Sequence, residues 1–79
     1  LALAPRYAPA LVNLGRAELL RGQRLALAAF QEAVAADAEN VDAHVNLGVL
    51  HQQMGKPHLA AKHWAKAREI APTDDRIPA

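Results

Sequence analysis

Apolar residues recur every three to four positions in four stretches of this chain, with short polar or glycine-containing segments between them. This spacing is typical of amphipathic helices, because residues three and four apart lie on the same helix face. No segment alternates apolar and polar residues with the period of two that indicates a strand. The pattern predicts an all-α protein with helices over residues 7–21, 24–36, 42–54 and 57–71.

Glycines and prolines mark the ends of these predicted helices. Gly22 and Gly55 follow the first and third helices, where a left-handed backbone is often needed and glycine adopts it readily. Pro57 lies in the first turn of the fourth helix, where its missing N–H is harmless, and Pro72 ends that helix. The loops are so short that consecutive helices are expected to run antiparallel, as helical hairpins.

The chain also repeats itself at an interval of 33 residues. The triplet Asn-Leu-Gly occurs at residues 13–15 and again at residues 46–48, and a further glycine follows each triplet seven residues later. An alanine-rich segment with one large aromatic residue, Phe30 or Trp64, then completes each unit. We expect the leucine and glycine of each triplet to point into the hairpin, where small residues allow the helices to cross closely and the aromatic ring fills the remaining space.

These units resemble the tetratricopeptide repeat, a helix–turn–helix module of about 34 residues. The unit over residues 41–74 matches the pattern of that family at Leu47, Gly48, Ala60, Trp64, Ala67 and Pro72. The unit over residues 8–40 matches it at Leu14, Gly15, Ala26, Phe30 and Ala33. Residues 1–7 match the tail of a preceding unit, with the last turn of a helix expected over residues 1–4 and stopped by Pro5, and residues 75–79 would open a following unit. The resemblance implies one domain over residues 1–79, in which the hairpins stack into a right-handed α-solenoid.

The chain departs from the family's pattern at a few positions. His44 and His51 stand where the first helix of a repeat carries aromatic residues, and Leu11 and Glu18 take those places in the first unit. Ala38 replaces the proline at the exit of the first unit. Two complete units are fewer than the three or so that such repeats usually need for independent stability. Because the chain also lacks an initiator methionine, we expect a piece of a longer protein whose ends expose apolar surface and can self-associate.

Composition and charge argue against several kinds of function. The net charge is only +1, and nine basic residues are mixed along the chain with eight acidic ones, so no basic face for nucleic acid is expected. No apolar run approaches the roughly 20 residues of a membrane span, so membrane insertion is not expected. The chain has no serine or cysteine, no nucleophile–base set and no glycine-rich phosphate loop, and we therefore expect no enzymatic activity. Composition leaves the compartment open, with a cytoplasmic location slightly favoured over a periplasmic one.

The four histidines raise the question of a metal site. His44 and His51 lie seven residues apart on one predicted helix, whereas zinc ligands on a helix usually lie about three or four apart. Both residues also stand at packing positions of the repeat, so their rings are expected in the hairpin interior. We therefore expect neither a metal ion nor a cofactor. Burial of these rings implies that acidification charges them at a desolvation cost and loosens the second hairpin.

The helix face opposite the hairpin core is the candidate binding surface. In the tetratricopeptide-repeat family, this face of the first helix of each repeat lines a concave groove that holds extended peptides or partner helices. In this chain the face and its flanks carry Val12, Asn13, Arg16 and Leu20 in the first unit and Asp42, Val45, Asn46, Val49 and Gln53 in the second.

The most specific feature of this face is an asparagine that recurs once per unit, at Asn13 and Asn46. A carboxamide carries donors and an acceptor, so it can bind a peptide backbone amide through two hydrogen bonds. Such repeated asparagines resemble the ladders in the repeat domains of protein O-linked N-acetylglucosamine transferases and kinesin light chains. The alternative is that they are solvated or bonded to neighbouring backbone. Val12 and Arg16 stand where carboxylate-binding members of the family need Lys and Asn, so capture of chaperone C-terminal tails is not expected.

The resemblance therefore implies a protein–protein interaction scaffold that binds a peptide or a partner protein in its groove. An alternative of a different class is the substrate-recruiting arm of a multidomain enzyme such as a glycosyltransferase. A second alternative is a module for homo-oligomerisation, in which the ends of the repeats stack on one another. The identity of the partner is not encoded in any motif of the chain.

Overall fold

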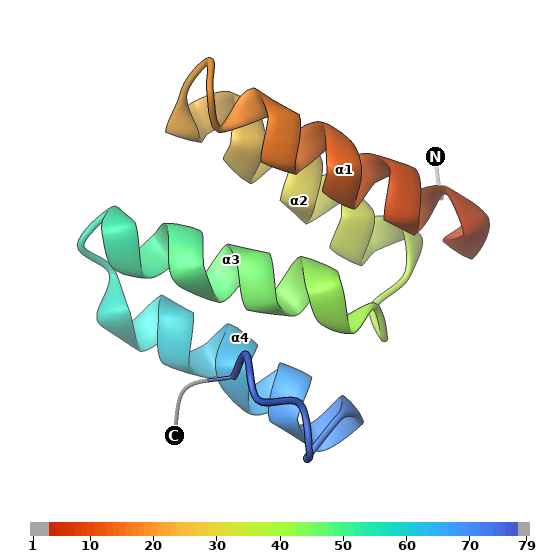
Figure 1. Ribbon diagram of the computed structural model, residues 1–79, viewed down its shortest axis with the longest axis vertical. Coiled ribbons are helices and arrows are strands. Elements are labelled where there is room, and N and C mark those ends of the chain that lie inside the picture. The colour runs from red at the N-terminus through yellow and green to blue at the C-terminus, as the bar shows by residue number, and fades with distance from the viewer. Residues whose placement is uncertain (1–3, 78–79) are drawn as a thin grey trace.

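Four α-helices form two antiparallel hairpins in the computed structural model, which describes residues 4–77 (Figure 1). A short 3-10 helix precedes the first hairpin. The elements are η1 (Pro5–Tyr7), α1 (Ala8–Glu18), α2 (Gln23–Ala36), α3 (Val41–Gln53) and α4 (Pro57–Ile70). Residues 4–77 contain no strand, so the all-α class predicted from the sequence is confirmed.

The helix ends lie close to their predicted positions, with the largest difference at the end of α1. This helix stops at Glu18 rather than at residue 21, because the next residues form a tight turn that the Gly22 N–H closes on the Glu18 carbonyl at 2.9 Å. Gly22 has a φ of 152° and Gly55 a φ of 78°, values that residues with a side chain rarely adopt. The helical turn expected over residues 1–4 lies largely outside the described residues, and Ala4 itself is extended.

The start of α3 is held by a side-chain cap. The Asn40 Oδ1 atom accepts a hydrogen bond from the Ala43 N–H at 2.9 Å, which satisfies one of the free donors at the helix N-terminus. Asp42 lies in the first turn of the same helix, where its negative charge interacts favourably with the helix dipole. Local sequence therefore determines where the second hairpin begins.

Within each hairpin an aromatic ring packs directly on a helix glycine. The Phe30 ring lies against Gly15, and the Trp64 ring lies against Gly48. A Cβ atom on residue 15 would lie 2.6 Å from Phe30 Cδ1, and one on residue 48 would lie 2.7 Å from Trp64 Cε2. Both distances are far shorter than a carbon–carbon van der Waals contact, so glycine at these positions is required by the close approach of the ring.

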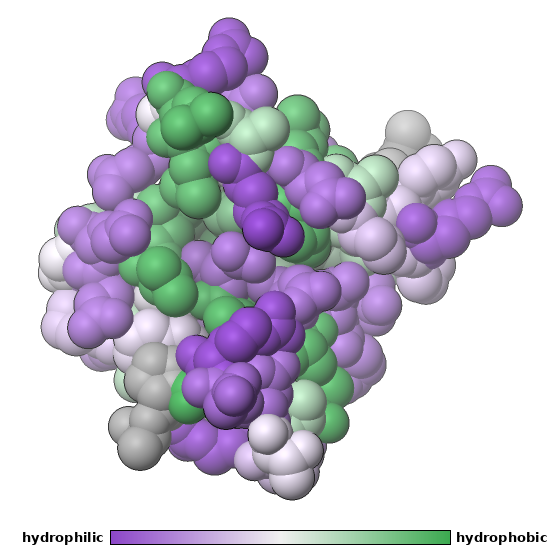
Figure 2. All heavy atoms as spheres, viewed as in Figure 1, coloured by the Kyte–Doolittle hydropathy of each residue, from purple (hydrophilic) through white to green (hydrophobic). Residues whose placement is uncertain are grey.

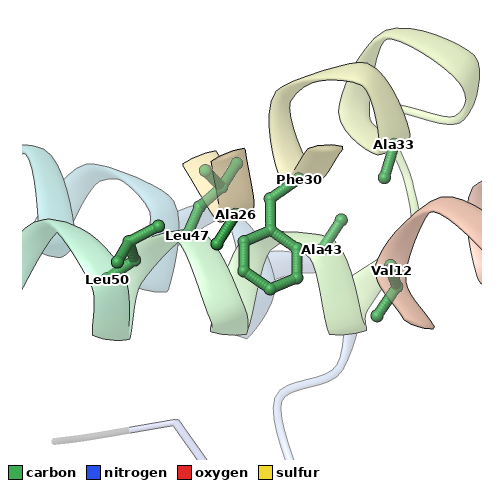
Figure 3. Close-up of a cluster of buried hydrophobic side chains, with 7 residues drawn as sticks. All are labelled: Val12, Ala26, Phe30, Ala33, Ala43, Leu47 and Leu50. Atoms are coloured by element: carbon green, nitrogen blue, oxygen red, sulfur yellow. The ribbon is translucent and has the colours of Figure 1, made fainter. Parts of the chain in front are cut away.

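The core of the molecule lies where α2 packs against both α1 and α3. Figure 3 shows Phe30 of α2 between Ala26 and Ala43, with Leu47 and Leu50 of α3 beside them. Phe30 is 1% exposed, so one aromatic ring fills the space within the first hairpin and also seals it against the second. The buried cluster is completed by further small and branched residues: Val12, Ala26, Ala33 and Ala43.

The two repeated leucines do not share one environment. Leu47 is buried as expected, at 1% exposed, but under α2 of the preceding hairpin, and Leu14 is 48% exposed, so the predicted position of these leucines inside their own hairpins is wrong. The physical reason is that this position of a repeat packs against the preceding hairpin rather than within its own. Leu47 is covered by α2, and no element of residues 4–77 covers the equivalent side of α1. Burial here is a property of the stack, not of the single unit.

Candidate functional site

The candidate binding residues divide between surface and core. Asn13, Arg16, Leu20, Asp42, Val49 and Gln53 are exposed, and Asn46 is partly buried. We call these seven residues, which lie on α1 and α3 or in the turn after α1, the α1–α3 face. The two helices also contact each other, so the two halves of this face lie on neighbouring elements.

Val12 and Val45, which the sequence placed on the flanks of this face, are buried. Their exposed fractions are 4% and 6%, and Val12 belongs to the core cluster shown in Figure 3. Helical periodicity puts them at the border between the two faces, and the neighbouring helix turns that border into core. Their side chains support the surface from below and have almost no area to offer a ligand.

The two repeated asparagines have different local partners. The Asn46 Nδ2 atom donates to the Asp42 carbonyl oxygen, one helical turn earlier, at 2.7 Å. This bond occupies one amide N–H and leaves the second N–H and the Oδ1 atom. The Asn13 side chain is exposed, and none of the side-chain hydrogen bonds found within residues 4–77 involves it. One of the two carboxamides is therefore oriented by its own helix, while the other is held only by its backbone.

The C-terminal segment reaches back to one end of the α1–α3 face. The Arg76 guanidinium forms ion pairs with Asp42 of α3 and with Asp74. Hydrogen bonds from the Arg76 side chain and backbone hold the pKa of Asp74 at about 2. Arg76 follows Asp42 by 34 residues, so the segment continues the register of the repeats. Asp42 was predicted from the sequence to contact a ligand, whereas this ion-pair partner within the chain was not predicted.

An apolar hollow of about 330 Å³ lies on the side of α1 that carries Leu14. The aromatic and aliphatic residues Tyr7, Ala10, Leu11 and Leu14 form its wall, and Glu32 of α2 lies at its edge. The equivalents of Ala10 and Leu14 on α3 are Ala43 and Leu47, which are 0% and 1% exposed under α2. The sequence contained this signal, because the 33-residue repeat aligns these positions.

Further apolar surface lies near the turn between α1 and α2. Leu19 and Leu20 are 42% and 93% exposed there. In Figure 2, apolar atoms gather at this turn, although most of the face in view is polar. Leu20 therefore projects fully into solvent at one end of the candidate surface.

Three histidines meet between α3 and α4. His63 of α4 lies 5.6 Å from His44 and 5.3 Å from His51 of α3, measured between ring centroids. His44 and His51 are buried, as their packing positions predicted, and His63 is half-buried. No role of His63 was predicted from the sequence, because only its position on the second helix of the hairpin brings it to the other two rings.

Burial and neighbouring positive charge lower the pKa of two of these rings. The pKa of His63 falls to about 4, mainly because burial disfavours its charged form and secondarily because His44, His51 and Lys62 lie near. Burial also lowers the pKa of His51, with smaller effects from Lys56 and His58. Residues 4–77 contain no group of three or more side chains from His, Cys, Asp and Glu that could hold a metal ion. Within the same residues no helix is both long and apolar enough to cross a membrane.

The fold and the internal repeat define the chain as an α-helical hairpin repeat. The family model of the tetratricopeptide repeat matches residues 41–74, which are the whole of the second unit and carry the second hairpin. Residues 41–74 therefore form a tetratricopeptide repeat, and repeats of this family typically mediate protein–protein interaction. No curated protein and no solved structure matches the chain.

Proposed function

We propose that the chain binds an extended peptide segment of a partner protein on the α1–α3 face. The observation that carries this proposal is the pair Asn13 and Asn46, which occupy the same position of two contacting helices and retain free amide groups. An extended peptide presents a backbone amide every 3.3 Å or so, and a carboxamide can pair with both of its polar atoms. Contacts of this kind hold a chain without selecting its side chains.

The remaining residues of the face give the bound peptide a chemical preference. Arg16 and Asp42 place opposite charges on the two helices, and Val49 offers an apolar surface between the polar positions. Asp42 is already paired with Arg76, so a ligand that contacts this carboxylate competes with the C-terminal segment. Affinity therefore comes from the backbone contacts at the asparagines, and the side-chain contacts are secondary.

The test is a titration calorimetry measurement with a peptide selected from an unbiased library on the wild-type chain. The double variant Asn13→Ala/Asn46→Ala should bind at least about tenfold more weakly, because each carboxamide contact contributes roughly 1 kcal/mol. The matched control is Gln31→Ala, which removes an exposed carboxamide from α2, outside the candidate face. Equal affinity of the double variant and the wild type would refute the proposal that the two asparagines bind the peptide backbone.

A second function, self-association through the ends of the stack, is favoured by a separate observation. The hollow beside Leu14 on α1 is equivalent to the surface of α3 that α2 covers. In the second repeat, α4 carries the surface that is equivalent to the covering surface of α2. Trp64 of α4 is only partly buried, whereas its equivalent Phe30 is 1% exposed. One chain thus exposes both halves of the contact that joins its own hairpins, as in a head-to-tail assembly.

Sedimentation velocity over a range of protein concentrations tests this second function. The wild type should sediment as larger species at higher concentration, and Leu14→Glu should remain monomeric because a carboxylate in the hollow opposes desolvation. Val49→Glu, which adds the same charge to another exposed apolar position, is the matched control and should associate like the wild type. A wild type that stays monomeric throughout would refute self-association and leave the peptide-binding proposal untouched.

A further inference from the structure

The three clustered histidines form a polar contact between α3 and α4. His63 of α4 is inserted between two rings that lie two helical turns apart on α3. The planes of His51 and His63 differ by only 5°, so these rings are stacked. In their neutral form, imidazole rings pack in this way much as other aromatic rings do. His44 and His51 stand at packing positions of the hairpin, so their rings contribute to its cohesion.

The hydrogen bonds of His44 determine where its hydrogen lies. Its Nε2 atom is 2.7 Å from the Ala38 carbonyl oxygen, which only accepts, so Nε2 must carry the hydrogen. In neutral His44 the Nδ1 atom is then a bare acceptor. The His63 Nδ1 atom lies 3.3 Å away and donates its N–H to this acceptor. The contact between the two helices therefore uses one hydrogen shared by two facing Nδ1 atoms.

Protonation disrupts this arrangement in a specific way. If both His44 and His63 are charged, each Nδ1 atom carries a hydrogen, and two N–H groups and two positive charges face each other. The His51 Nδ1 atom is buried and meets no hydrogen-bond acceptor within residues 4–77, so a proton added there is not compensated. The stack has no arrangement in which all three rings are charged and the present contacts remain.

The charged groups around the stack reinforce this effect. Lys62 on α4 acts on His63, and Lys56 in the turn before α4, together with His58 on α4, acts on His51. All of these groups oppose a further positive charge. The loop before α3 contributes the neutral Ala38 carbonyl, which contacts His44. On its other side, α3 packs against apolar residues of α1 and α2.

We propose that the stack of His44, His63 and His51 is an acid-sensitive joint, which holds α3 against α4 while the rings are neutral and releases them when His63 and His51 take up protons. The sign follows from linkage. In the unfolded chain a histidine titrates near 6.5, whereas in the folded chain the pKa of His63 is lowered to about 4. The stabilising effect of the neutral ring is therefore complete above pH 6.5 and is lost as the pH falls toward 4.

The test is urea unfolding at pH 7.5 and at pH 5, followed by the fluorescence of Trp64, the single tryptophan of the chain. For His63 alone, the unfolding equilibrium constant should rise by about tenfold at the lower pH, a value reduced for solvent screening of the half-exposed ring. His63→Gln stays neutral and keeps an amide N–H to donate to His44, so its unfolding midpoint should fall clearly less than that of the wild type. Asp74 does not interfere, since its pKa of about 2 lies below this range.

His58→Gln is the control, because it removes an exposed histidine of the same helix that lies outside the stack and makes the smallest of the named contributions to the lowered pKa of His51. It should show nearly the same loss of stability at pH 5 as the wild type. An equal loss in His63→Gln and the wild type would overturn the proposal, as would a loss that only His58→Gln removes. NMR titration of the wild-type histidine rings decides the matter independently of any variant. His51 and His63 should titrate below 6.5, and titration of both at or above 6.5 would refute the acid-sensitive joint.

Discussion

The replacement Gly48→Ala tests the close contact between a helix glycine and an aromatic ring in the second hairpin. It adds one methyl group at a position where its carbon would lie 2.7 Å from Trp64 Cε2, more than half an ångström inside an ordinary contact. Two effects of opposite sign then compete. Alanine stabilises a helix interior by up to about 1 kcal/mol relative to glycine. Overpacking of a filled site costs typically about 1–3 kcal/mol, and here the neighbour is a rigid indole that must move as a whole.

We therefore expect Gly48→Ala to destabilise the chain by about 1–2 kcal/mol. With a urea m-value of about 1 kcal/mol/M for a protein of this size, the unfolding midpoint should fall by about 1–2 M. Circular dichroism is the appropriate readout, because it does not depend on the indole itself. Gln53→Ala, an exposed position on the same helix, should change the free energy of unfolding by no more than about 0.5 kcal/mol.

A double-mutant cycle isolates the clash from the other effects of the methyl group. On a Trp64→Leu background the planar ring is gone, so Gly48→Ala should cost little there or even stabilise α3. The difference between the two costs measures the contact between residue 48 and the ring. A Gly48→Ala variant that is as stable as the wild type would refute the close-approach explanation, because helix propensity would then outweigh packing.

Two further substitutions test how the helices are capped and stacked. Asn40→Ala removes the cap on the Ala43 N–H and should cost about 1 kcal/mol in urea unfolding, whereas Asn40→Asp should retain most of that stability. Leu47→Ala should cost about 2–5 kcal/mol because it leaves a cavity under α2, while Leu14→Ala in a monomeric sample should cost no more than about 0.5 kcal/mol. Equal costs at the two leucines would contradict their different burial.

Much of the candidate site was predicted from sequence, but its partners were not. The repeated asparagines were placed by helical periodicity, and Asn13 is exposed as that periodicity requires. The hydrogen bond from Asn46 to the Asp42 carbonyl is local, yet whether a side chain binds its own helix or a ligand cannot be read from spacing. The ion pair between Arg76 and Asp42 joins residues 34 apart, so it depends on how the chain returns over α3.

The sequence by itself determined the local features of this protein. The period of its apolar residues specified four helices, and Gly22, Gly55 and Pro57 specified where turns and a helix start belong, because these residues restrict or extend the backbone locally. The pairing of a small residue with an aromatic ring in each unit also followed, since both partners lie in one repeat. Residues 41–74 carry enough of this pattern to match the repeat family.

Tertiary structure alone decided which of the repeated positions become core. Leu14 and Leu47 have the same place in the pattern, but only Leu47 has α2 packed on it, so one is half-exposed and the other buried. In the same way the pKa of His63 is lowered mainly by burial and secondarily by His44 and His51, two rings on another helix. The periodicity of apolar residues predicts which face of a helix is apolar. Which neighbour covers that face depends on the stacking of hairpins, and burial, charge and pKa values follow from the neighbour.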